Sequence, residues 1–178
     1  YHSLTEIILE FSKRLGQAID CAAFGIAGPI QGHCCTTTNL PWNIDARQME
    51  LDLHIPSIHL INDLEATAWG IDALQDHEIH TLQPGSSSQI GNRAVIAAGT
   101  GLGQAGLFWD GKRHLPFATE GGHCDFAPGN MQEYELLRSL QHSREQVCWE
   151  DILSGPGLCK IYRFLLKQHN TPEPKWFQ

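Results

Sequence analysis

Residues 57–68 have the sequence SIHLINDLEATA, which indicates the fold class. Its first part, residues 57–61, is rich in branched apolar side chains and predicts a buried strand. Asn62 and Asp63 follow, and after them apolar residues recur at helical spacing as far as Ile71. A strand that leads through a polar tip into a helix is typical of α/β proteins, which bind ligands at the carboxyl ends of their strands.

Other segments on both sides of this stretch have the same character. The predicted elements are helices over residues 4–15, 133–140 and 158–168, strands over residues 21–27 and 93–98, and a hairpin partner over residues 104–109 with its turn at Asp110 and Gly111. Ser3 and Gly16 are the predicted caps of the first helix. Residues 154–157, Ser-Gly-Pro-Gly, are predicted to interrupt the secondary structure before the last helix.

The composition restricts the class of protein. The chain has 178 residues, of which 42% are hydrophobic, and a formal net charge of -8. No stretch approaches the roughly 20 apolar residues of a membrane span, and Lys and Arg form no block that would favour nucleic acid. The six cysteines form no C-x-x-C pair, which favours reduced thiols. We therefore expect a soluble cytoplasmic protein that binds a small molecule, and neither nucleic acid nor a membrane.

The pair Asn62 and Asp63 allows two interpretations. The Asp63 carboxylate can accept a proton from a substrate hydroxyl while Asn62 forms hydrogen bonds with a neighbouring hydroxyl. Asp and Asn are also preferred residues at helix N-termini. On this dipeptide alone, capping of the following helix is the favoured interpretation.

Residues 98–103, AGTGLG, form a glycine-rich turn after the predicted strand. Where β-carbons are missing, backbone N–H groups can approach an anion, and Thr100 adds a hydroxyl. The pattern is neither G-x-x-x-x-G-K-[ST] nor G-x-G-x-x-G followed by a helix, so the standard P-loop and dinucleotide interpretations fail. A tight turn that binds no ligand is an equally good interpretation.

A third group of polar residues consists of Glu120 and His123, which flank two glycines, and of Glu150. Such side chains supply the paired donors and acceptors that sugar hydroxyls require. Loop formation by Glu120 and His123 and solvation of Glu150 are the alternatives. The nearby cysteines lack the spacing of a zinc site, so no metal site is predicted here.

Six motifs occur in a fixed order along the chain: AGPI at residues 27–30, TNLPW at 38–42, INDLEA at 61–66, AGTGLG at 98–103, EGGHCDFAP at 120–128 and ILSGPGL at 152–158. In this set the chain resembles the bacterial-type glucokinases over nearly its whole length. The resemblance implies the two-domain α/β fold of actin-like ATPases and sugar kinases, which is ribonuclease H-like and closes around sugar and ATP. Residues 1–72 would belong to the small domain and residues 73–178 to part of the large one.

The resemblance also implies a role for each candidate residue. Asp63 would be the catalytic base that takes the proton of the glucose 6-hydroxyl, which then attacks the γ-phosphate of ATP, and Asn62 would hold the sugar. The other implied positions are Glu120, His123 and Glu150 for the sugar, Gly99, Thr100 and Gly101 for the phosphates, Thr38 and Asn39 at the border of the sugar site, and Gly28 and Pro29 at the floor of the cleft.

Two motifs of the family have no counterpart in the chain. One is the D-x-G-G-T phosphate motif, whose Asp helps to organise Mg²⁺, and the other is the C-terminal adenosine motif. We therefore expect a central fragment, incomplete at both ends and inactive by itself. The zinc cluster of related sugar kinases and repressors is also missing from the sequence, which disfavours zinc.

The function that the resemblance implies is ATP-dependent phosphorylation of glucose to glucose 6-phosphate, at the entry of glycolysis, by a cytoplasmic enzyme that uses ATP and Mg²⁺. A kinase for another hexose and a catalytically silent sugar-binding module remain alternatives. The sequence does not separate glucose from its epimers, because that selectivity depends on hydrogen-bond angles. Assembly into a homodimer is a further open expectation.

Overall fold

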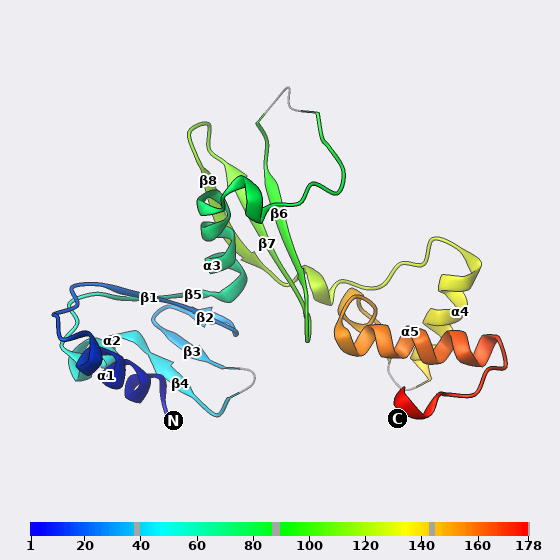
Figure 1. The fold of residues 1–178 in the computed structure, drawn as a ribbon, viewed down its shortest axis with the longest axis horizontal. Coiled ribbons are helices and arrows are strands. Elements are labelled where there is room, and N and C mark those ends of the chain that lie inside the picture. The colour runs from blue at the N-terminus through cyan, green and yellow to red at the C-terminus, as the bar shows by residue number, and fades with distance from the viewer. Residues whose placement is uncertain (38–39, 87–89, 143–144, 178) are drawn as a thin grey trace. The chain divides into compact units, whose positions relative to one another are not determined.

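The structure, a computed structural model, describes residues 1–37, 40–86, 90–142 and 145–177 (Figure 1). The chain separates into two compact units. The first unit consists of Tyr1–Arg93 and Gly106–Ala118, and the second of Ala94–Ala105 and Thr119–Gln178. Each unit has its own hydrophobic core. The predicted boundary after residue 72 is the boundary between the small and large domains of the complete fold, and it stays a prediction.

The first helix, α1 (Leu4–Leu15), confirms the predicted one together with both of its caps. The Ser3 hydroxyl accepts a hydrogen bond from the N–H of Glu6 at 3.2 Å. Gly16 ends the helix in the left-handed conformation, with φ 65°. A residue without a β-carbon adopts this conformation at little cost, which is why the helix stops there.

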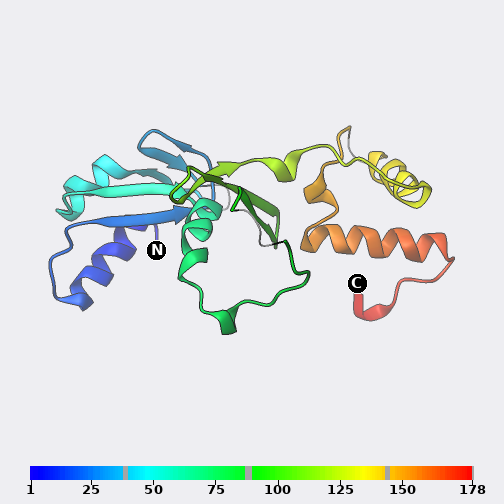
Figure 2. The same cartoon turned by 90° about the horizontal axis from the view of Figure 1, so that it is seen from above.

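Asn62 and Asp63 lie at the end of one of two paired parallel strands. Strands β1 (Ala22–Ile26) and β5 (Ile58–Asn62) lie side by side, in a register that puts Ile26 opposite Asn62 (Figure 2). Helix α3 (Asp63–Gly70) begins directly where β5 ends. A β-carbon on Gly25 would lie 2.7 Å from that of Ala66, so the glycine lets α3 approach β1. The predicted order of strand, polar tip and helix is confirmed.

Residues 30–53 form elements that the sequence analysis did not predict. Strands β2 (Ile30–Gln31), β3 (Cys34–Thr36) and β4 (Asn43–Asp45) form an antiparallel sheet in that order, and α2 (Ala46–Leu53) follows. The Asp45 carboxylate caps α2 by accepting hydrogen bonds from the N–H groups of Arg47 and Gln48. Strands of two or three residues are too short to show an alternating pattern in the sequence.

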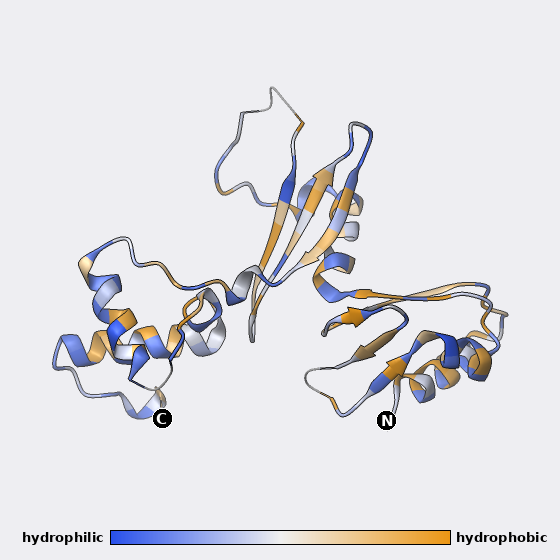
Figure 3. Ribbon diagram, turned by 180° about the vertical axis from the view of Figure 1, so that it is seen from behind, coloured by the Kyte–Doolittle hydropathy of each residue, from blue (hydrophilic) through white to orange (hydrophobic). Residues whose placement is uncertain are grey.

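The core of the first unit gathers side chains from α1, α2 and the strands. Its buried residues are Ile8, Ile26, Cys35, Ile44, Ala46, Met49, Ile55 and Ile58. The helices of this unit carry both hydrophobic and hydrophilic residues (Figure 3). Helix α1 packs against this core through Ile8.

A second sheet has the strand order β6-β7-β8 and consists of β6 (Arg93–Ala98), β7 (Leu102–Trp109) and β8 (His114–Thr119). The predicted strand and its hairpin partner are confirmed, whereas β8 was not predicted. The turn lies where predicted, since the N–H of Asp110 donates to the carbonyl oxygen of Arg113 at 3.2 Å and Gly111 has φ 94°. The N–H groups of Arg113 and Lys112 also donate to the Asp110 carboxylate, which lowers its pKa.

The second unit contains α4 (Met131–Gln141) and α5 (Gly155–Gln168) around a core of Phe126, Leu136, Val147 and Ile152. Both predicted helices are confirmed. The prediction that residues 154–157 interrupt the secondary structure is wrong, because Ser154 caps α5 and the next three residues form its first turn. A proline is tolerated there, since an N–H in the first turn has no partner within the helix.

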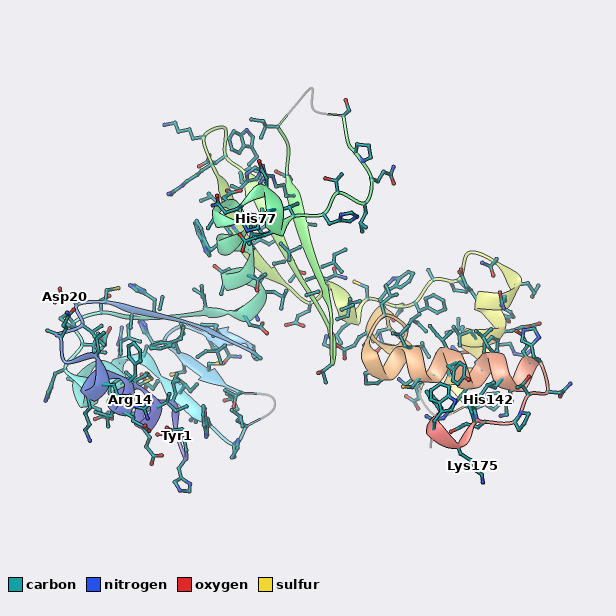
Figure 4. All side chains as sticks on the ribbon, in the orientation of Figure 1. Tyr1, Arg14, Asp20, His77, His142 and Lys175 are labelled. Atoms are coloured by element: carbon teal, nitrogen blue, oxygen red, sulfur yellow. The ribbon has the colours of Figure 1, made fainter. Side chains whose placement is uncertain are left out.

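The chain after α5 turns back beside that helix. The centroid of the Tyr162 ring lies 6.1 Å from the ring centroid of Trp176 and 4.7 Å from that of Phe177. Figure 4 labels Lys175 in this returning segment. None of the described helices combines the length and the apolar composition needed to cross a membrane.

Candidate functional site

Asn62 and Asp63 lie at the junction of β5 and α3, in the first unit. Asn62 is the residue that caps α3: its Oδ1 accepts hydrogen bonds from the N–H groups of Leu64 at 3.0 Å and Glu65 at 3.3 Å. Its Nδ2 is a donor that this cap does not use. Asp63, half-buried, is the first residue of the helix, and its Oδ1 lies 2.9 Å from the Leu64 nitrogen. The capping interpretation is thus confirmed for Asn62, while Asp63 lies one residue beyond the cap.

Strand β1 leads past Asn62 into Gly28 and Pro29. Gly28 has φ 153°, and a β-carbon there would lie 2.8 Å from the carbonyl oxygen of Thr36. The turn therefore requires glycine, since any side chain would displace β3. A role for Gly28 and Pro29 in shaping a cleft stays a prediction. The predicted sugar-border residues Thr38 and Asn39 lie outside the described residues.

Glu120, His123 and Glu150, the predicted sugar-binding residues of the second unit, lie close together. Glu120 precedes the short helical turn η3 (Gly121–His123), and Glu150 lies in the turn η4 (Trp149–Asp151). His123 lies between the two carboxylates, with Nδ1 3.3 Å from Oε2 of Glu120 and Nε2 3.7 Å from Oε1 of Glu150. Glu120 and His123 are exposed, and Glu150 is half-buried. Donors and acceptors this close together suit the recognition of neighbouring hydroxyls.

Backbone contacts hold η3 and η4 beside each other. The N–H of Trp149 donates to the carbonyl oxygen of Cys124 at 3.0 Å, and the N–H of Phe126 donates to that of Val147 at 2.9 Å. Gly122 is buried, and a β-carbon there would overlap a backbone carbonyl oxygen of β7. The sequence EGGH therefore forms a turn whose own backbone packs directly on β7.

The glycine-rich turn at residues 99–101 connects β6 to β7. It is closed by a hydrogen bond of 2.8 Å from the Gly99 N–H to the Gly101 carbonyl oxygen. The N–H of Gly155, at the start of α5, donates to the Gly99 carbonyl oxygen at 2.7 Å. Gly99 and Thr100 are exposed, and open space surrounds the place where a β-carbon of Gly99 would be. The turn is tight, and its exposed backbone fits a phosphate group.

Glu150 connects this turn to the candidate sugar-binding residue His123. Its Oε2 accepts a hydrogen bond of 2.9 Å from the N–H of Leu102, the residue that follows the turn. A β-carbon on Gly101 would lie only 2.5 Å from the same oxygen. One carboxylate therefore reaches the backbone of the turn with one oxygen and lies near His123 with the other.

Asp151 and Lys160 lie next to this group and were not predicted from the sequence. The Lys160 ammonium donates to Oδ1 of Asp151 at 2.6 Å, and the Cys148 N–H donates to Oδ2 at 3.2 Å. Burial by itself would raise the pKa of Asp151, but the hydrogen bonds from Lys160 and Cys148 outweigh it and lower the pKa below the usual value. A loop residue and a helix residue nine positions apart leave no pattern by which a sequence could reveal their contact.

Over the ranges that the structure describes, no group of three or more His, Cys, Asp or Glu side chains could hold a metal ion. His123 lies between carboxylates that face it singly, from two different turns.

Comparison with known proteins gives a consistent family. A family model described as "Glucokinase" matches residues 1–176. The glucokinase of Nostoc punctiforme is 40% identical over 173 residues, which cover 93% of this chain and 51% of that protein. The glucokinase of Trichormus variabilis is 42% identical over 146 residues, which cover 81% of this chain and 43% of that protein. The chain spans about half the length of the curated relatives that it matches.

Solved structures agree on the fold. The glucokinase from an Antarctic psychrotroph has a TM-score of 0.83 at 24% identity, and the alignment covers 98% of this chain and 54% of that one. The glucokinase from Balamuthia mandrillaris in complex with glucose has a TM-score of 0.72 at 26% identity, over 94% of this chain and 52% of that one. The predicted α/β sugar-kinase fold is confirmed.

Proposed function

The chain belongs to the glucokinase family, and on this premise we propose that it supplies the sugar-binding residues and one phosphate-binding turn of an ATP-dependent glucokinase. The observation that carries the proposal is the cluster of Glu120, His123 and Glu150, which the Glu150 carboxylate connects to the glycine-rich turn. Glucose presents several neighbouring hydroxyls, and the cluster offers matching donors and acceptors. The glucose bound in the Balamuthia mandrillaris relative supports this choice of sugar.

We assign the role of catalytic base to Asp63. Because Asn62 caps α3, the carboxylate of Asp63 is not required as the cap and can accept the proton of the 6-hydroxyl. Asn62 keeps its Oδ1 in the cap and can donate from Nδ2 to a neighbouring hydroxyl. The junction of β5 and α3 therefore fixes both side chains before any sugar arrives, which is the positioning that phosphoryl transfer demands of a protein.

We assign the phosphates of ATP to Gly99, Thr100 and Gly101. The turn offers exposed backbone and the Thr100 hydroxyl, and its hydrogen bond with Gly155 places it at the start of α5, the positive end of that helix dipole. Mg²⁺ bound to ATP would neutralise the charge that develops on the transferred group. The residues of the turn would orient the phosphates, with no side chain in the way at Gly99.

We propose that the reaction takes place in the cytoplasm, at the entry of glycolysis. We expect full activity only in a protein as long as the curated relatives, which we call the full-length protein. The test is a coupled assay of glucose 6-phosphate formation with ATP and Mg²⁺, repeated with mannose, galactose and fructose. Turnover that is fastest with glucose is expected. Faster turnover with another hexose would reassign the substrate, and glucose binding without product would identify a silent sugar-binding module. Sedimentation of the same sample tests the proposed homodimer.

A further inference from the structure

We propose that Asp151 and Lys160 are positioning residues for Glu150, and that their ion pair sets the affinity of the site for its sugar. This inference rests on the proposed function, because it concerns how Glu150 is held to bind glucose. Asp151 directly follows Glu150 in the turn η4, and Lys160 belongs to α5. Both residues would act through the position of that turn.

The two oxygens of Asp151 have different partners. Oδ1 accepts a hydrogen bond from the Lys160 ammonium at 2.6 Å. Oδ2 accepts one from the N–H of Cys148 at 3.2 Å and one from its thiol at 3.4 Å. One oxygen therefore closes the turn η4 on itself, while the other attaches the turn to α5.

Burial makes this attachment rigid. Asp151 is only 6% exposed, and a buried carboxylate that loses its partner pays the full cost of desolvation. The neighbouring pair between Arg163 and Glu173 differs, because the Arg163 side chain is 55% exposed. Exposed pairs of this kind contribute little and leave the side chains free to move. Of these two pairs on α5, only that of Asp151 is built to hold a turn in place.

The position of Asp151 determines that of Glu150. The N–H of Asp151 donates to the carbonyl oxygen of Cys148 at 3.0 Å, so the backbone between them forms one closed turn. Glu150 extends from the middle of this turn to the Leu102 N–H at 2.9 Å and to within 3.7 Å of His123. A turn released from α5 would shift this carboxylate away from both neighbours, and the sugar would meet a misplaced acceptor.

Two substitutions test the pair. Asp151→Asn keeps the volume of the side chain but leaves a single oxygen, which can serve either Lys160 or Cys148. Lys160→Gln keeps a donor but removes the charge and shortens the reach. We expect each to raise the KM and Kd for glucose about tenfold, with kcat within about threefold of the parent, since the loss affects binding rather than the transferred phosphoryl group. Lys160→Arg, which keeps the charge, should stay within about twofold of the parent.

The matched control is Arg163→Gln, which breaks the exposed ion pair one turn further along α5. It should leave the glucose KM and Kd within about twofold of the parent. All variants are measured in the full-length protein, at temperatures well below the Tm of each. If Asp151→Asn fails to fold, Lys160→Gln decides the outcome, because it leaves the hydrogen bonds of Asp151 to Cys148 in place.

A double-mutant cycle shows whether Asp151 acts through Glu150. Added to Glu150→Gln, Asp151→Asn should raise the glucose Kd by less than about a further twofold. Unchanged glucose Kd in Asp151→Asn and Lys160→Gln, an equal effect in Arg163→Gln, or effects that multiply in the cycle would overturn the inference. A parent that binds glucose without phosphorylating it contradicts the proposed function alone, since the Kd values still test the pair. A parent that does not bind glucose overturns both.

Discussion

Gly101→Ala tests whether Glu150 couples the glycine-rich turn to the sugar site. The new β-carbon would lie 2.5 Å from Oε2 of Glu150, which is closer than van der Waals contact allows. The carboxylate must then move and lose its hydrogen bond from the Leu102 N–H. A hydrogen bond to a charged and partly buried group is worth about 1–3 kcal/mol, so we expect glucose affinity to fall by about 5- to 150-fold.

The assay is calorimetric titration of the full-length protein with glucose in the absence of ATP, so that phosphate binding does not enter the result. Gly99→Ala is the matched control, because its β-carbon would enter open space in the same turn. We expect this control to keep the glucose Kd within about twofold. Glu150 does not couple the turn to the sugar site if Gly101→Ala binds glucose as tightly as the parent, or if both variants lose affinity equally.

Further predictions concern the sugar cluster, acid stability and the fold. Replacing Glu120, His123 or Glu150 singly by Ala should weaken glucose binding by about 1–3 kcal/mol each in calorimetry, because each change leaves sugar hydroxyls unpaired; unchanged affinity in all three would exclude the cluster as the sugar site. The pKa of Asp151 is lower in the folded than in the unfolded state, so its contribution to stability is complete above about pH 4 and is lost as the pH falls through the folded pKa. Urea titrations should therefore show a smaller loss of unfolding free energy below pH 4 in Asp151→Asn than in the parent, and an equal loss would contradict the assignment. Gly28→Ala should lower the Tm, because a β-carbon there meets the Thr36 carbonyl oxygen and φ 153° is unfavourable for alanine; a Tm equal to that of the parent would show that the turn adapts.

Local patterns predicted the parts of the fold whose causes are local. The caps of α1 and the change from strand to helix at Asn62 depend on residues within a few positions of each other, so the sequence reveals them. Strands β2, β3 and β4 depend on pairing between short segments and leave no such pattern. The start of α5 was predicted wrongly because glycine and proline usually interrupt a helix, whereas Ser154 makes them its first turn.

In the candidate site, too, local contacts were predictable from the sequence and long-range contacts were not. Glu120 and His123 are three residues apart, and their contact follows from one turn. Glu150 reaches Leu102 from 48 positions further along the chain, and only the resemblance to glucokinases connected these segments in advance. Asp151 and Lys160 were missed for the same physical reason, because a buried ion pair between a loop and a helix depends on tertiary packing.

We propose that Asp63 takes the proton of the glucose 6-hydroxyl, and the substitution Asp63→Asn tests this role. Asparagine keeps the shape of the side chain and its hydrogen bonding but cannot accept the proton. In the full-length protein, kcat for glucose 6-phosphate formation should fall by about 10²–10⁴, while the Kd for glucose stays within about threefold. A variant that retains kcat within a few-fold of the parent would show that Asp63 is not the base and is only a residue of the first turn of α3.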